Sequence, residues 1–106
     1  MSQANTQPIR LLLVDDEPRI VSSLERILRK EKYTIFTCHS GKDGLEIIKN
    51  EDIGVVMSDL MMPEMDGITF LENVRYIEPD IVQILLTGNA TLDNTLAAIN
   101  RLQIFG

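Results

Sequence analysis

Apolar strand patterns alternate with amphipathic helix patterns along the chain, and this alternation constrains the fold more than any other feature. The run from Ile9 to Val14 is almost continuously apolar, as expected of a strand buried on both faces. Strand patterns recur at Tyr33 to Cys38, Ile53 to Ser58 and Ile81 to Leu86. Such alternation predicts a parallel sheet with right-handed crossovers and helices on both faces.

Four helix patterns separate or follow these strands. Pro18 suits the first turn of the first helix, and Ser40 with Asp43 indicates the cap of the second. Pro79 ends the third helix, and Thr91 is expected to cap a fourth. The predicted core-facing residues recur at helical spacing: Ile20, Val21, Leu24, Ile27 and Leu28, then Leu45 and Ile48, then Ile68, Leu71, Val74 and Ile77.

The composition fits one small soluble domain. The chain has 106 residues, of which 44% are hydrophobic, and a formal net charge of −6. An excess of acidic over basic residues argues against a nucleic-acid-binding surface. Residues 1–8 are polar and are expected to form a disordered lead-in to a domain over 9–106.

The sequence has neither a run of apolar residues long enough for a membrane span nor a second cysteine for a disulfide. No apolar run approaches the length of a membrane span, so no membrane partner is expected. The single cysteine, Cys38, cannot form an internal disulfide and is interpreted as buried packing, and a cytoplasmic protein is expected. His39 is interpreted as a surface turn residue.

Acidic side chains follow two of the predicted strands. Asp15 and Asp16 come directly after the first strand, and Asp59 comes directly after the third. The carboxyl ends of parallel strands meet at one edge of the sheet, where folds of this kind bind ligands. Clustered carboxylates repel one another, and Mg²⁺ is held by a few oxygen ligands plus water, so a Mg²⁺ site is expected there. The alternative is that the acidic pair only stabilises a helix N-terminus, the role favoured for Glu17.

Small and turn-forming residues accompany the carboxylates. Thr87 ends the fourth strand and is followed by Gly88 and Asn89. A hydroxyl at this edge can hydrogen-bond an anion held by the cation, and Gly88 leaves room for that anion. The loop after the third strand contains Pro63 and Gly67, which are turn formers and are expected to shape it.

Three motifs together resemble the receiver domain of two-component response regulators. They are Leu-Leu-Val-Asp-Asp-Glu-Pro at 12–18, Asp-Leu-Met-Met-Pro-Glu-Met-Asp-Gly at 59–67 and Leu-Leu-Thr-Gly at 85–88. The resemblance begins at about Ile9 and covers the rest of the chain. It implies an α/β, doubly wound parallel sheet of flavodoxin-like topology, with strand order 2-1-3-4-5.

The resemblance also implies chemical roles. Asp59 matches the phosphoacceptor, which receives a phosphoryl group from a sensor histidine kinase or a phosphotransfer protein. Asp15 and Asp16 match the acidic pair that holds Mg²⁺, together with Asp59 and the backbone carbonyl of Met61. Thr87 and Gly88 match the switch residues that contact the phosphoryl group.

Two further expectations concern the switch and the acyl phosphate. Phosphorylation is expected to shift a two-state equilibrium of the region 88–102. Met61 and Asn89 match the positions that tune loss of the phosphoryl group to water. Because Met61 cannot orient a water molecule, slow to intermediate self-dephosphorylation is expected, with no other enzymatic activity.

The family pattern extends past the last residue of this sequence. It includes a fifth strand, a lysine that contacts the phosphoryl group, and a fifth helix. Residues 103–106 match only the start of that strand, Phe105 is interpreted as core, and the lysine is absent from this chain. These departures predict a truncated domain, in which a second copy covers the exposed face, with segment exchange as one route to a homo-oligomer.

Two other functions fit parts of the pattern. A receiver-like interaction module that is not phosphorylated is favoured by the missing lysine and opposed by the intact carboxylates. A metal-dependent phosphatase that forms an aspartyl phosphate needs a general acid two residues after its nucleophile, where this chain has Met61.

Overall fold

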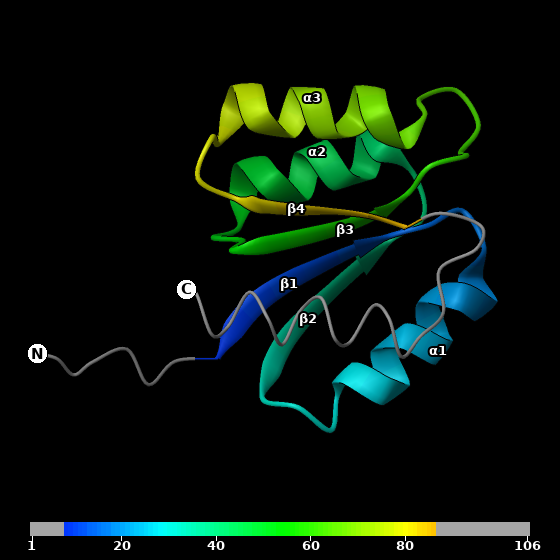
Figure 1. Cartoon of the computed structure of the whole chain (residues 1–106), viewed down its shortest axis with the longest axis vertical. Coiled ribbons are helices and arrows are strands. Elements are labelled where there is room, and N and C mark those ends of the chain that lie inside the picture. The colour runs from blue at the N-terminus through cyan, green and yellow to red at the C-terminus, as the bar shows by residue number, and fades with distance from the viewer. Residues whose placement is uncertain (1–7, 87–106) are drawn as a thin grey trace, which may run out of the picture.

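The computed structural model describes residues 8–86, which form four strands and three helices in alternation. Figure 1 shows their arrangement. The elements are β1 (Ile9–Val14), α1 (Pro18–Leu28), β2 (Tyr33–Cys38), α2 (Gly41–Asn50), β3 (Val55–Asp59), α3 (Gly67–Ile77) and β4 (Val82–Leu86). The predicted alternation is confirmed over this range, because each strand pattern and each of the first three helix patterns forms the expected element.

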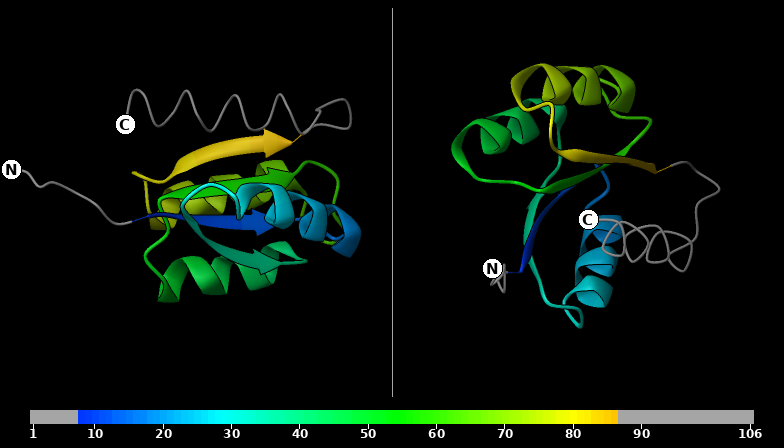
Figure 2. Two further views of the ribbon diagram at one scale, coloured as in Figure 1. Left: turned by 90° about the horizontal axis from the view of Figure 1, so that it is seen from below. Right: turned by 60° about the vertical axis from the view of Figure 1, so that its left-hand side comes forward.

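The four strands form one parallel sheet of order β2-β1-β3-β4. This confirms the first four positions of the predicted order. In the register, Val14 pairs with Cys38 on one side and with Ser58 on the other, and Asp59 pairs with Leu86. The strands therefore end together, and their arrows point the same way in Figure 2.

Helices cover both faces of the sheet, with α2 and α3 on one face and α1 on the other (Figure 1). The central strand β1 contributes alternate side chains to two cores. Leu12 and Val14 pack with Phe70 on the α2–α3 side, whereas Leu11 and Leu13 pack on the α1 side. Burial on both faces explains why β1 has a continuous apolar run instead of an alternating one.

The helix starts follow local hydrogen-bonding rules. The Ser40 hydroxyl accepts a hydrogen bond from the Asp43 N–H at 3.1 Å, which confirms the predicted cap of α2. The Asp66 carboxylate caps α3 in the same way, by accepting from the Thr69 N–H at 2.8 Å. Glu17 occupies the N-cap position of α1, but its side chain makes no capping hydrogen bond.

Some predicted boundaries and orientations are wrong. The third strand begins at Val55 and the fourth at Val82, each later than predicted. Ile20 and Ile68, which were expected to face the core, are 44% and 47% exposed. Both lie in the first turn of their helices, before the first buried hydrophobic residues of those helices, Val21 and Phe70.

Several expectations fall on residues outside the described range 8–86. These are the lead-in except Pro8, the switch and tuning positions Thr87, Gly88 and Asn89, the helix expected after Thr91, and the fifth strand. Within the described range, no helix is both long enough and apolar enough to cross a membrane.

Candidate functional site

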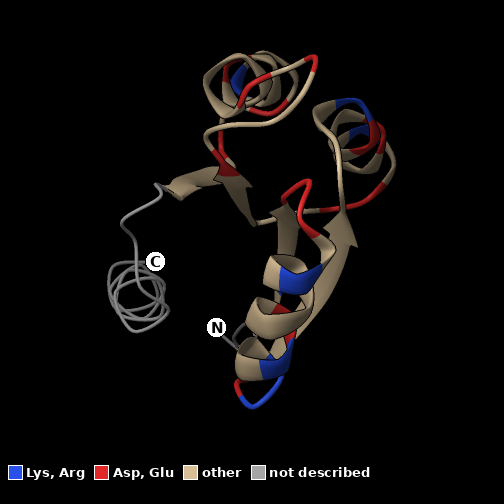
Figure 3. Cartoon of the chain, turned by 90° about the vertical axis from the view of Figure 1, so that its right-hand side faces the viewer, with Lys and Arg blue, Asp and Glu red and all other residues tan. Residues whose placement is uncertain are grey.

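Three carboxylates meet at the carboxyl edge of the sheet. Asp15 and Asp16 follow β1 directly, and Asp59 is the last residue of β3. Each offers a carboxylate oxygen, and these three oxygens lie within 4.8 Å of one another. Figure 3 faces this edge and shows acidic segments at the strand ends. The structure thus brings together the three acidic residues that the sequence placed in one site.

Asp15 is the most constrained of the three. The residue is only 5% exposed, and its Oδ1 accepts a hydrogen bond from the Glu17 N–H at 2.9 Å. Burial raises the pKa of this carboxyl above its usual value, and the negative charges of Asp59 and Asp16 raise it further, against the opposing Glu17 hydrogen bond. The ionised carboxylate is therefore unfavourable here unless a cation compensates it.

The backbone of Asp15 is held by the end of β2. Its N–H donates to the Cys38 carbonyl at 3.3 Å, and its own carbonyl lies 3.1 Å from Nδ1 of His39. From the sequence, His39 was interpreted as a surface turn residue without a functional role. The register of β1 and β2 explains the contact. Val14 pairs with Cys38, so Asp15 and His39, the residues that follow these two strands, lie next to each other.

The loop between β3 and α3 is anchored at both ends. The Leu60 N–H donates to the Leu86 carbonyl at 3.2 Å, which continues the β3–β4 ladder past Asp59. At the other end, the Gly67 N–H donates to the Leu60 carbonyl at 2.8 Å. These hydrogen bonds fold the loop back onto the end of β3 and hold the start of α3 beside Asp59.

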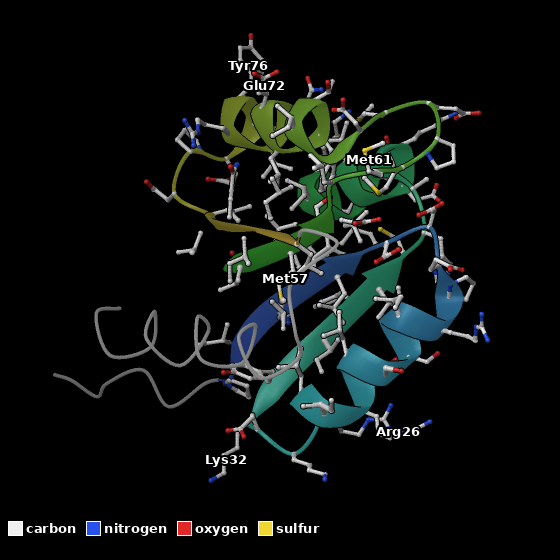
Figure 4. The ribbon with its side chains drawn as sticks, turned by 45° about the vertical axis from the view of Figure 1, so that its right-hand side comes forward. Arg26, Lys32, Met57, Met61, Glu72 and Tyr76 are labelled. Carbon is white, nitrogen blue, oxygen red and sulfur yellow. The ribbon has the colours of Figure 1, made fainter. Side chains whose placement is uncertain are left out.

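Pro63 and Met61 lie within this loop. The Pro63 carbonyl accepts from the Met65 N–H at 2.7 Å, across Glu64, whose φ is 70°. A non-glycine residue with positive φ is uncommon and marks a tight turn. Met61 is 74% exposed, and Figure 4 places its side chain on the loop that follows β3.

The donor set fits a hard divalent cation. Mg²⁺ prefers oxygen ligands and is bound by one or two carboxylates with water completing its shell. The three oxygens within 4.8 Å of one another supply that chemistry. Among residues 8–86 no ion pair joins a basic side chain to the buried Asp15, so the residues present fit Mg²⁺.

The structure is that of a doubly wound α/β protein. Its candidate cation-binding site consists of the carboxylates at the carboxyl ends of the strands. The chain belongs to the response regulator receiver domain family, whose model matches residues 11–104. Receiver domains are signalling domains and bind Mg²⁺ at an acidic pocket. The sequence-based assignment to this family and fold is confirmed.

Similar proteins and solved structures support the assignment to this family. The chain is 36% identical over 92 residues to the transcriptional regulatory protein GlrR of Escherichia coli, matching 87% of this chain and 21% of GlrR. It thus spans about a fifth of that relative's length.

A CheY-like receiver domain protein from Methanospirillum hungatei matches with a TM-score of 0.75 and 32% identity over 89% of this chain and 75% of that one. The response regulator TrrA from Thermotoga maritima, in complex with Mg²⁺-BeF, matches with a TM-score of 0.73 and 33% identity, over 77% of this chain and 71% of that one.

Proposed function

We propose that Asp59 is the phosphoacceptor of this receiver domain and that Asp15 and Asp16 hold Mg²⁺ beside it. The observation that carries the proposal is the convergence of the three carboxylate oxygens to within 4.8 Å. Asp59 is half-buried at the end of β3, so it is partly accessible to a donor while its backbone is fixed by the sheet.

The transfer is a single displacement at phosphorus. A carboxylate oxygen of Asp59 attacks the phosphorus of a phosphohistidine, the P–N bond breaks, and its electron pair goes to the leaving imidazole nitrogen. The product is an acyl phosphate on Asp59. Mg²⁺, held by Asp15, Asp16, Asp59 and the Met61 carbonyl, would offset the repulsion between the anionic nucleophile and the anionic donor.

The β3–β4 register supports the proposed switch positions, which were assigned from the family resemblance. Asp59 pairs with Leu86, so Thr87 is the next residue along the chain from the phosphoacceptor's own partner. We propose that the Thr87 hydroxyl hydrogen-bonds a phosphoryl oxygen and that Gly88, which lacks a side chain, leaves room for the phosphoryl group. Asn89 and Met61 would then tune hydrolysis, and the region 88–102 would respond to phosphorylation.

The phosphodonor partner, a sensor histidine kinase or phosphotransfer protein, would dock on the exposed face of α1. This helix begins directly after the acidic segment, and a hollow of about 330 Å³ on it is lined by Pro18, Arg19, Ser22, Ser23 and Arg26. Within the described range, no ion pair joins Arg19 or Arg26 to an acidic residue. Arg26 extends away from the sheet in Figure 4. A cationic patch on an acidic chain favours a partner with an acidic surface.

Phosphorylation by acetyl phosphate tests the proposal without needing the partner. Intact-protein mass spectrometry should show one added phosphoryl group that requires Mg²⁺ and is absent from Asp59→Asn. The matched control is Asp80→Asn, an equal charge change at the opposite edge of the sheet, which should be phosphorylated like the wild type. A folded wild type that gains no phosphoryl group with Mg²⁺ would favour the interaction-module alternative.

A further inference from the structure

We infer that His39 is a positioning residue for the acidic site, because it holds the backbone of Asp15 in the geometry that binds Mg²⁺. Its Nδ1 lies 3.1 Å from the Asp15 carbonyl oxygen, although the two residues are 24 positions apart. The inference rests on the proposed function, since it concerns the same Mg²⁺ site.

The direction of this hydrogen bond follows from its acceptor. A carbonyl oxygen cannot donate, so Nδ1 of His39 carries the hydrogen and donates it. The imidazolium and the neutral Nδ1–H tautomer both provide this donor, whereas the Nε2–H tautomer does not.

The contact falls where the regular ladder between β1 and β2 ends. The last residue pair of the two strands is Val14 with Cys38. One residue further, the Cys38 carbonyl accepts the Asp15 N–H and His39 donates to the Asp15 carbonyl. The end of β2 thus fixes both backbone polar groups of Asp15, one through a main-chain atom and one through a side chain.

The hydrogen bond from His39 also opposes the electrostatic repulsion within the acidic site. Three carboxylates within 4.8 Å repel one another, and without a cation this repulsion pushes the segment carrying Asp15 and Asp16 away from Asp59. A hydrogen bond from outside the acidic cluster opposes that movement and lowers the cost of assembling the site. Removing it should weaken Mg²⁺ binding more than it weakens the fold.

The test compares three variants by calorimetric Mg²⁺ titration and by urea unfolding in EDTA. His39→Ala should raise the Mg²⁺ dissociation constant about fivefold, as expected for the loss of one hydrogen bond. His39→Asn should restore most of the affinity, because its amide nitrogen sits close to the Nδ1 position of histidine. Ser40→Ala is the matched control, because it removes the N-cap of α2 at the residue after His39. It should lower the free energy of unfolding while leaving the Mg²⁺ dissociation constant unchanged.

A second readout needs no metal. Amide hydrogen exchange at Asp15 should be faster in His39→Ala than in the wild type and in His39→Asn when EDTA is present. An unchanged dissociation constant in His39→Ala would overturn the inference, as would a wild type that does not bind Mg²⁺. If Mg²⁺ binding depends on His39 but Asp59 is never phosphorylated, the proposed function fails while the role of His39 stands.

Discussion

Gly67, the first residue of α3, lies against the main-chain carbonyl of Asp59. A Cβ atom built on Gly67 would collide with the Asp59 carbonyl oxygen and crowd the Leu60 Cα. The Gly67 N–H meanwhile donates to the Leu60 carbonyl at 2.8 Å. The absence of a side chain at Gly67 is thus what allows α3 to begin directly beside Asp59, the proposed phosphoacceptor.

Gly67→Ala should destabilise the domain despite the better helix propensity of alanine. The added methyl group has to displace backbone, which is stiff, so we expect a loss of about 2 kcal/mol in the free energy of unfolding measured in urea. Gly54→Ala is the matched control, because its Cβ would meet only the Arg10 carbonyl oxygen at 3.7 Å, an ordinary contact. Equal stability of the two variants would contradict the steric reading of Gly67.

The sequence predicted the parts of this fold that depend on local patterns. The bounds of β1 and β2 are as predicted because apolar and β-branched runs between turns determine them. The convergence of Asp15 with Asp59 was predictable because parallel strands end at a common edge.

The missed features depend on tertiary placement. Helical spacing put Ile20 and Ile68 on core-facing stripes, but spacing alone does not determine which positions in the first turn of a helix are covered by the rest of the fold. The contact between His39 and Asp15 needs the register of two strands far apart in sequence, which no local pattern contains.

Asp15→Asn should stabilise the domain at neutral pH when Mg²⁺ is absent. Burial is the main cause of the raised pKa of Asp15, so the folded state disfavours the ionised carboxylate. A raised pKa means stability that is fully present at low pH and lost as the pH rises through the folded pKa. The advantage of the asparagine should therefore appear at neutral pH and shrink in acid, as followed by urea unfolding in EDTA across pH.

Mg²⁺ should reverse this ranking. The wild type should gain about 2.7 kcal/mol of stability at a Mg²⁺ concentration one hundred times its dissociation constant. Asp15→Asn should lose most of this gain because it lacks the buried carboxylate, whereas Asp80→Asn at the far edge should keep it. The idea fails if Mg²⁺ stabilises Asp15→Asn as much as the wild type.

Met61→Asn should shorten the lifetime of the acyl phosphate. Met61 lies two residues after Asp59 and is exposed, so its apolar side chain can shield the acyl phosphate but cannot orient water. An amide at this position can hydrogen-bond an attacking water molecule. Decay of the phosphorylated protein after removal of acetyl phosphate gives the rate, with Met61→Leu as the apolar control. Identical lifetimes in the asparagine and leucine variants would count against a tuning role.

Charge reversal on α1 should slow transfer from a protein donor but not from acetyl phosphate. Arg19 and Arg26 are exposed on the proposed docking face, so Arg19→Glu or Arg26→Glu should reduce the association rate about tenfold at low salt. The donor is a phosphohistidine protein that phosphorylates the wild-type chain. Arg75→Glu on α3, across the sheet, makes the same charge change and should have no effect. Equal slowing by Arg75→Glu would indicate a net-charge effect instead of a docking face.

Protonation of Asp66 at low pH should lower the free energy of unfolding of the domain. The hydrogen bond from the Thr69 N–H at 2.8 Å lowers the pKa of the Asp66 carboxyl. A lowered pKa means a contribution that is present above the unfolded pKa and lost as the pH falls through the folded one. Asp66→Asn keeps an oxygen acceptor for the cap but does not titrate, so its stability should fall less than that of the wild type on acidification. Urea unfolding at a series of pH values down to about 2 measures this difference, and parallel curves would show that the cap does not depend on the charge.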